Sequence, residues 1–164
     1  MNKAYLLIGG NIGNRLKNLA RAKQLIGENC GPVNTASAIY ETAAWGKEDQ
    51  PGFLNQALCI STTLNAEDLM TEILGIEKKM GRIRAQKWTA RIIDIDILFF
   101  NNEVYNSEFI HIPHPQLPDR NFALIPLAEI AGKYVHPVLK KTILLLLKEC
   151  TDTLEVKKYE DVKI

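Results

Sequence analysis

The sequence predicts an α+β fold, and three observations lead to this class. Strand-like segments, in which apolar residues run together or alternate with polar ones, recur at residues 4–8, 33–42, 54–64 and 93–97. Two amphipathic segments with helical spacing lie between the first and second strands and between the third and fourth. The 164 residues, of which 46% are hydrophobic and 24% charged, are enough for a sizeable core.

The first strand, residues 4–8, ends at the glycine-rich residues 9–14. A helix is expected from about Arg15 to Glu28, before Gly31-Pro32 breaks the chain. Residues 9–14 match neither glycine pattern of nucleotide-binding loops, so they favour a structural turn over a phosphate-binding loop. Extended structure is predicted again from Val33 to about Thr42.

A loop is predicted from Ala43 to Phe53, where a proline and two glycines interrupt the pattern, and a strand from Leu54 to Leu64. Asn65 can cap a second helix, because its side chain can accept a hydrogen bond from a backbone N–H of the first turn. The apolar positions of this helix lie along one face, and they are Leu69, Ile73, Ile76 and Met80. The last strand of the core runs through residues 93–97.

The predicted order is strand, helix, strand, strand, helix, strand, which is the ferredoxin-like βαββαβ arrangement. The C-terminal third adds a proline-rich loop at residues 113–118 and additional helices near Phe122–Ile130 and Leu139–Cys150. No repeat, low-complexity segment or linker divides the chain. We therefore expect a single domain over residues 1–164.

Composition limits the classes of function. A net charge of +1 argues against bulk attraction to nucleic acid or to a membrane. The three cysteines are widely spaced and form no metal or redox motif, which is typical of a reducing cytoplasm. No signal peptide or apolar span is apparent. We expect a cytoplasmic monomer that binds neither nucleic acid nor membrane.

The strand from Ile93 to Ile97 carries the most informative pattern of the chain. Apolar and acidic residues alternate strictly, so Asp94 and Asp96 lie side by side on one face while the isoleucines point into a core. Two adjacent carboxylates suit Mg²⁺, which fills its other positions with water and substrate phosphates. The alternative is a solvated edge strand whose acids only keep it soluble.

A basic segment directly precedes this strand, and its residues are Lys78, Lys79, Arg82, Arg84, Lys87 and Arg91. Arginine suits phosphate oxygens, and carboxylates for a metal together with guanidinium groups for an anion are typical of phosphoryl transfer. Trp88, inside the same segment, is either a buried anchor or part of a lid. The combined pattern indicates a metal–polyphosphate site.

Other candidate residues remain ambiguous from the sequence. His111 and His114 flank Pro113, but no cysteine or third histidine stands at ligand spacing, so a phosphate or ribose contact of His114 is favoured over zinc. For Phe53 and Phe122 a place in the core is favoured, because phenylalanines are more often core residues than ligand-stacking ones.

A set of motifs along the chain points to a known family. The most specific is Arg91-Ile-Ile-Asp94-Ile-Asp96 with the upstream Gly81-Arg82-Ile83-Arg84. The others are the start at residues 9–14, Tyr40-Glu-Thr42, residues 50–55, Glu77, Trp88, Pro113-His114 and Arg120-Asn-Phe122. By these motifs the chain resembles the 6-hydroxymethyl-7,8-dihydropterin pyrophosphokinase family over nearly its whole length. The resemblance implies a ferredoxin-like fold, in agreement with the order above.

The resemblance also implies an activity and a set of site residues. The reaction would transfer pyrophosphate from ATP, the co-substrate, to 6-hydroxymethyl-7,8-dihydropterin, giving AMP in folate biosynthesis. Asp94 and Asp96 would bind two Mg²⁺ ions and act in catalysis with Arg82 and Arg91. The residues lining the ATP site would be Glu77, Arg84, Trp88, Ile97, His114 and Arg120. The residues of the pterin pocket would be Thr42, Ala43, Trp45, Phe53, Asn55 and Phe122.

The chain departs from the family pattern at three places. Ala43-Ala44 replaces a common proline after the pocket threonine, Phe53 replaces a frequent tyrosine, and Thr89-Ala90 replaces Gly-Pro before the catalytic arginine. Two rival functions are a metal-dependent transferase acting on another alcohol and a ferredoxin-like RNA-binding module. The aliphatic strands and near-neutral charge argue against the second.

Overall fold

The computed structural model describes residues 1–43, 52–81 and 92–160 of the chain. Six strands of this part form one sheet in the order β5-β1-β4-β3-β8, with β2 also pairing with β4. Their bounds are β1 (Asn2–Gly10), β2 (Val33–Ala36), β3 (Tyr40–Thr42), β4 (Phe53–Thr62), β5 (Asp94–Phe100) and β8 (Val156–Lys158). All neighbouring strands are antiparallel.

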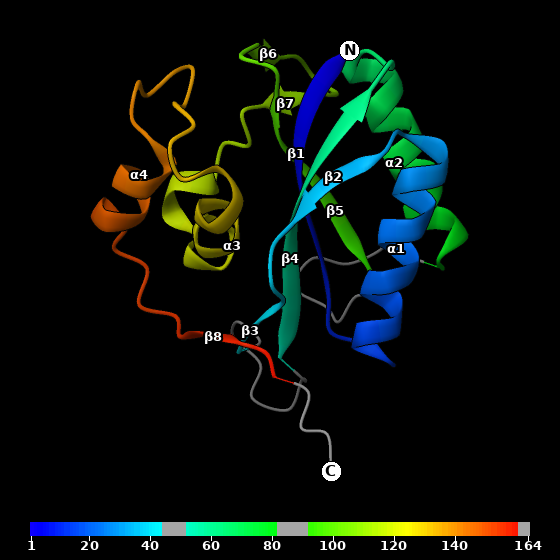
Figure 1. Ribbon diagram of the computed structural model, residues 1–164, viewed down its shortest axis with the longest axis horizontal. Helices are drawn as coiled ribbons and strands as arrows, with labels where there is room; N and C mark the ends of the chain where they lie inside the picture. The colour runs from blue at the N-terminus through cyan, green and yellow to red at the C-terminus, as the bar shows by residue number, and fades with distance from the viewer. Residues whose placement is uncertain (44–51, 82–91, 161–164) are drawn as a thin grey trace.

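Helices cover both faces of this sheet (Figure 1). One face carries α1 (Arg15–Asn29) and α2 (Ala66–Lys79), and the other carries α3 (Asn121–Ala131) and α4 (Ile143–Glu149). The order of β1, α1, β2/β3, β4, α2 and β5 confirms the predicted ferredoxin-like arrangement with additional C-terminal helices.

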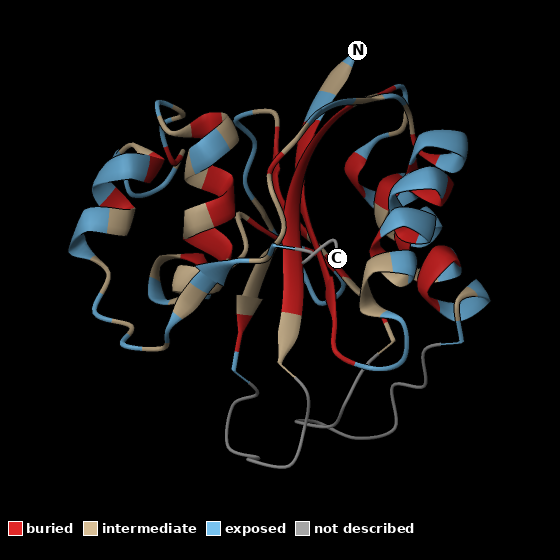
Figure 2. Cartoon of the chain, turned by 60° about the horizontal axis from the view of Figure 1, so that its bottom comes forward, coloured by how far each residue is buried: buried red, intermediate tan, exposed pale blue. Residues whose placement is uncertain are grey.

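Alternation along the central strands divides the core into two parts. On β1, Leu6 and Ile8 pack in the cluster beneath α1 and α2, whereas Tyr5 and Leu7 pack in the cluster beneath α3 and α4. Figure 2 shows the strands mostly buried between the two helix layers, whose outer faces are exposed. Successive side chains of a strand point to opposite faces, so a single sheet supports two distinct environments.

Both helices of the ferredoxin-like core begin at an asparagine cap. Asn14 accepts a hydrogen bond from the Lys17 N–H at 3.1 Å, and Asn65 accepts one from Asp68 at 2.8 Å. Gly13 has φ +69°, a left-handed value that glycine adopts without strain. The structure thus confirms the predicted cap at Asn65. The predicted turn at residues 9–14 begins only at Asn11, because β1 extends to Gly10.

The predicted continuous strand from Val33 to Thr42 was wrong, because β2 ends at Ala36 and β3 begins at Tyr40. Ser37 interrupts the ladder. Its Oγ accepts a hydrogen bond from the Ala57 N–H at 2.9 Å, so a side chain takes a position that a backbone carbonyl would hold.

The last helix starts later than the predicted Leu139, because Thr142 caps α4 and its first residue is Ile143. The preceding residues form a turn instead. His136 Nδ1 accepts hydrogen bonds from the N–H groups of Val138 and Leu139 at 3.2 and 3.0 Å, and Lys140 has φ +59°. These bonds give the backbone partners that a helix would otherwise supply.

Four short elements were not predicted, and they are β6 (Tyr105–Asn106), β7 (His111–Ile112), the 3₁₀ helix η1 (Leu117–Asp119) and β8. Each has at most three residues, too few for a hydrophobic period to be seen. None of the helices in the described ranges has the length and apolar character needed to cross a membrane.

Candidate active site

The acidic pair, Asp94 and Asp96, lies on the face of β5 that is directed toward α3 and α4. Ile93, Ile95 and Ile97 are 0%, 4% and 3% exposed and pack in the other core cluster, whereas Asp94 and Asp96 are half-buried. The predicted alternation is thereby confirmed. Two carboxylates that share a rigid strand face offer hard oxygen ligands two residues apart, which suits Mg²⁺.

Strand register places Asp94 in a row with Asn55, the amide predicted to bind the pterin. Asp94 pairs with Gly9 of β1, Gly9 pairs with Asn55 of β4, and Asn55 pairs with Tyr40 of β3. Directly paired residues point to the same face of a sheet. Neighbouring strands are about 4.8 Å apart, so Asp94 and Asn55 are separated by about 10 Å across a single glycine.

Gly9 provides the space that this row needs. A Cβ at position 9 would lie 2.1 Å from Asn55 Oδ1, so the amide of Asn55 lies directly over the glycine. Any other residue would displace that amide. A glycine inside a strand is a sign of such a close approach, whereas the sequence pattern of residues 9–14 predicts a turn.

The residues predicted to form the pterin pocket lie where β3 ends and β4 begins. Thr42 and Phe53 are register partners, and α3, which carries Phe122, packs over both strands. Thr42 is 3% exposed, and its Oγ1 has no hydrogen-bond partner among the residues that the structure describes. A buried hydroxyl without a partner is costly, so this atom is suited to a polar ligand. Ala43, the next predicted residue, is exposed.

The two phenylalanines are both partly exposed, unlike the core aromatic Phe99. The guanidinium of Arg120 lies over the ring of Phe122 at 5.4 Å from its centroid. Arg120 also donates a hydrogen bond to Gln116. The partly exposed ring and the cation over it suit contact with a flat, polar ligand.

His114 lies beside the acidic pair, because its backbone N–H donates to the Leu98 carbonyl of β5 at 3.1 Å. Its Nδ1 accepts from the Gln116 N–H, and its Nε2 is 3.9 Å from Asp96 Oδ1. Burial, followed by the charge of Arg120, lowers the pKa of His114 to about 4. At neutral pH the imidazole is thus neutral, the contact with Asp96 is not an ion pair, and Nε2 carries a hydrogen.

Two residues predicted to line the ATP site lie behind the acids. Glu77 of α2 is 1% exposed, and its Oε2 accepts a hydrogen bond from the Ile95 N–H at 2.8 Å. Ile95 separates Asp94 from Asp96, so this bond fixes the edge strand between them. The side chain of Ile97 lies in the same buried cluster. Both residues support β5 from its covered side, and their contact with ATP stays a prediction.

Five predicted site residues lie outside the described part of the chain, and they are Trp45, Arg82, Arg84, Trp88 and Arg91. Among the described residues, no three potential metal ligands of the His, Cys, Asp or Glu type come together. Mg²⁺ does not require such a cluster, because it takes one or two protein carboxylates and completes its shell with water and phosphate oxygens.

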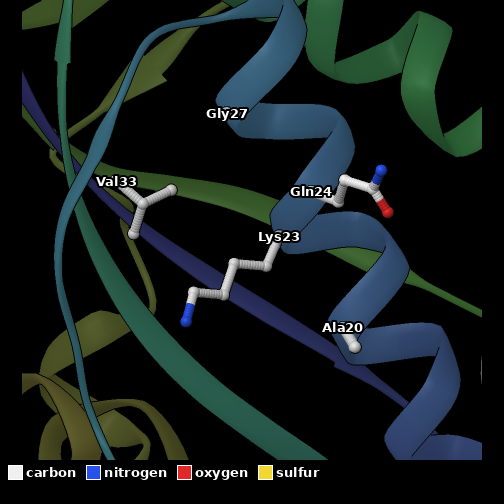
Figure 3. Close-up of a pocket in the computed structure, with 5 residues that line it drawn as sticks. All are labelled: Ala20, Lys23, Gln24, Gly27 and Val33. Atoms are coloured by element: carbon white, nitrogen blue, oxygen red, sulfur yellow. The ribbon is translucent and has the colours of Figure 1, made fainter.

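A shallow groove lies elsewhere on the molecule, between α1 and β2. Its volume is about 440 Å³, and Figure 3 shows Lys23 extending from α1 beside Val33. Its other lining residues are Ala20, Gln24 and Gly27. Because α1 covers the face opposite the acids, this groove is not part of the candidate active site.

Comparison with known proteins agrees with this geometry. The family model described as 7,8-dihydro-6-hydroxymethylpterin-pyrophosphokinase (HPPK) matches residues 5–132. The chain is 37% identical over 143 residues to the 2-amino-4-hydroxy-6-hydroxymethyldihydropteridine pyrophosphokinase of Aquifex aeolicus, covering 87% of this chain and 89% of the relative. It is 43% identical over 130 residues to the Bacillus subtilis enzyme of the same name, covering 79% and 78%.

Solved structures show the same fold. The HPPK-DHPS of Plasmodium falciparum superposes with a TM-score of 0.74 at 20% identity, covering 90% of this chain and 43% of the longer one. Of the family motifs in the described part of the chain, Gly9, Asn55 and Asp94 form one register row, and Thr42 and Phe53 are register partners beside it. Its fold agrees with that of these structures, and its sequence shows that the chain belongs to the 7,8-dihydro-6-hydroxymethylpterin-pyrophosphokinase family.

Proposed function

We propose that the reaction of this family takes place on the α3/α4 face of the sheet, with the pterin over Asn55 and the phosphates of ATP over Asp94 and Asp96. The protein is an ATP-dependent pyrophosphokinase of folate biosynthesis. It transfers the pyrophosphate of ATP to 6-hydroxymethyl-7,8-dihydropterin, and AMP leaves. The observation that carries the placement is the register row Asp94–Gly9–Asn55.

On the pterin side, the chain offers a flat slot with polar groups at one end. Phe53 and Phe122 would hold the bicyclic ring between their faces, because both are partly exposed beside the row. The Asn55 amide and the Thr42 hydroxyl would bind its polar edge, and Thr42 Oγ1 would gain the partner that it lacks among the described residues. These contacts would fix the direction of the hydroxymethyl group.

On the phosphate side, Asp94 and Asp96 would hold two Mg²⁺ ions. Bound there, the ions would neutralise the charge that develops on the phosphate oxygens. His114 would donate its Nε2–H to a phosphate oxygen, because its Nδ1 accepts the Gln116 N–H and the neutral ring therefore carries its hydrogen on Nε2. Arg120 would add a positive charge nearby, and Arg82, Arg84 and Arg91 would add more by the resemblance. Catalysis would consist mainly of positioning and charge neutralisation.

The direct test is incubation of the protein with ATP, Mg²⁺ and 6-hydroxymethyl-7,8-dihydropterin, with separation of the nucleotide products. We expect AMP and the pterin diphosphate, and no ADP. Formation of ADP would indicate an ordinary kinase. If AMP appears equally with other alcohols, or if Asn55→Ala leaves pterin affinity unchanged, the protein is instead a transferase without a pterin pocket.

We further infer that residues 1–164 act as one domain, and as a monomer in the cytoplasm. Within the described ranges, α1, α2 and α3 pack on the one sheet, and α4 packs on α3. The cysteines Cys30, Cys59 and Cys150 are unpaired thiols, which is typical of a reducing compartment. Light scattering of the purified protein tests the monomer.

A further inference from the structure

Arg15 binds two strands at the same time. Its Nη1 lies 2.5 Å from Glu41 Oε2 of β3 and donates a second hydrogen bond, at 2.8 Å, to the carbonyl oxygen of Gly52. Gly52 directly precedes Phe53, the first residue of β4. A single guanidinium thus connects β3 with the start of β4.

These two contacts are each one residue away from the proposed pterin wall. Glu41 precedes Thr42, Gly52 precedes Phe53, and Thr42 and Phe53 are register partners. Neighbouring residues of a strand point to opposite faces, so Glu41 projects toward α1 while Thr42 faces the pterin side. Arg15 therefore acts on the wall from behind and has no reason to touch the ligand.

The C-terminal segment closes the same cluster. β8 pairs with β3 on the side away from β4, with Val156 opposite Thr42. The N–H of Tyr159 donates to the Ile39 carbonyl at 2.8 Å, and its ring lies 5.6 Å from the Arg15 guanidinium. The three-residue strand β3 is thereby held on both edges, and Arg15 contacts groups on both sides of it.

The location of Arg15 argues against a role in the stability of its own helix. It is the first residue of α1, where the positive end of the helix dipole disfavours a cation. Its ion pair is also partly exposed, with 22% and 39% of the two side chains accessible, and such pairs contribute little to folding. Its planar fork, in contrast, suits simultaneous contact with a carboxylate and a carbonyl.

We propose that Arg15 is a positioning residue for the pterin pocket, holding Thr42 and Phe53 in register through Glu41 and the Gly52 carbonyl. This inference rests on the proposed placement of the pterin. It predicts a selective effect. Loss of Arg15 loosens the pterin wall and leaves the phosphate side unchanged, because Asp94 lies on β5, at the other end of the row.

The test compares Arg15→Ala with Arg21→Ala, an exposed arginine two turns further along the same helix. Affinity is measured for 6-hydroxymethyl-7,8-dihydropterin and, separately, for a non-hydrolysable ATP analogue with Mg²⁺. For Arg15→Ala we expect pterin affinity to fall by about threefold to tenfold, the scale of one charge-assisted hydrogen bond partly transmitted. We expect the ATP-analogue affinity and the thermal midpoint to match those of Arg21→Ala.

Steady-state kinetics and a second pair of variants complete the test. The KM for pterin should rise in Arg15→Ala while kcat at saturating pterin is retained. Glu41→Gln, which keeps an acceptor for the guanidinium, should bind pterin better than Glu41→Ala. Unchanged pterin affinity in Arg15→Ala, or equal loss of both ligands, would overturn the inference. Failure of the unmodified protein to bind pterin would overturn the proposed placement instead.

Discussion

The two faces of the sheet differ in what their side chains do, although the same strands build both. Beneath α1 and α2, the side chains of β1, β4 and β5 form a continuous apolar cluster that is aliphatic except for Phe100. Beneath α3 and α4, the corresponding positions include Gly9, Asn55, Asp94 and Asp96 at one end and an aromatic cluster at the other. Alternate side chains of the same strand therefore serve the core and the candidate site, so the two functions are not assigned to separate parts of the chain.

The difference teaches how a small protein can separate stability from activity. Residues that point to the aliphatic face contribute burial, at about 25 cal/mol per Å² of apolar surface removed from water. Their neighbours on the other face can then carry polar groups without weakening the core. Adjacent residues of β5 should therefore give opposite results when they are changed.

The largest effect is expected for Asp96→Ala. Loss of one of the two carboxylates should lower kcat by about a thousandfold or more, the range for loss of a main electrostatic contributor. The affinity for the ATP analogue should lose its Mg²⁺ dependence, and the urea midpoint should stay close to that of the unmodified protein. The control is Glu108→Ala, an exposed acid away from the sheet. Near-normal turnover of Asp96→Ala would contradict the assignment.

The next effect concerns its neighbour on the opposite face. Ile95→Ala removes a side chain that is 4% exposed and should cost about 2–4 kcal/mol of unfolding free energy, because a cavity remains. Urea denaturation measures it, with Ile12→Ala, which is 37% exposed, as the control. If Ile95→Ala proves as stable as the control while Asp96→Ala unfolds, the two faces do not divide the work as described.

A smaller effect should distinguish the proposed pterin side, near Asn55, from the proposed phosphate side, near Asp94. Phe122→Ala should weaken pterin binding by about 1–3 kcal/mol, the range of aromatic stacking losses, with little effect on the ATP analogue. Phe122→Leu keeps apolar volume without the ring and should recover only part of the loss. Equal weakening of both ligands would indicate a collapsed core, and Phe122 would then be structural.

The smallest effect is the pH dependence of stability that His136, which packs against Phe99 in the aromatic cluster of the α3/α4 face, should cause. Burial lowers the pKa of His136, so the unfolded chain takes up its proton first as the pH falls. Stability should therefore decline below about pH 6.5, the unperturbed histidine value. His136→Gln should flatten this decline only in part, because His114, with a pKa lowered to about 4, acts in the same direction. A decline of unchanged steepness in the variant would exclude His136 as a contributor.

The sequence predicted the elements whose signals are local. Alternation over Ile93–Ile97, the cap at Asn65 and the helical spacing after it each depend on neighbouring residues, and each was confirmed. The division of residues 33–42 was not predicted, because it depends on a hydrogen bond between Ser37 and Ala57, twenty positions away. Strand β8 was not predicted either, because it forms by pairing with β3, which is far away in the sequence.

The site shows the same limit. The pattern of the acids and the resemblance supplied candidate residues, but not their arrangement, because register between strands is set across the fold. Gly9 was interpreted as part of a turn, although its function in the structure is to leave room for Asn55. Arg15 carried no local pattern that distinguished it from other charged residues at a helix end.

One consequence of the topology concerns the behaviour of the protein at high concentration. β5 is an edge strand, and an exposed edge is a template on which another chain can add a strand. Here the Ile95 N–H already donates its hydrogen bond to Glu77, and the carboxylates of Asp94 and Asp96 flank Ile95 in the strand. A second chain approaching in strand register would bring its own acids against them. We therefore expect the carboxylates proposed for phosphate chemistry also to oppose the addition of a further strand at this edge.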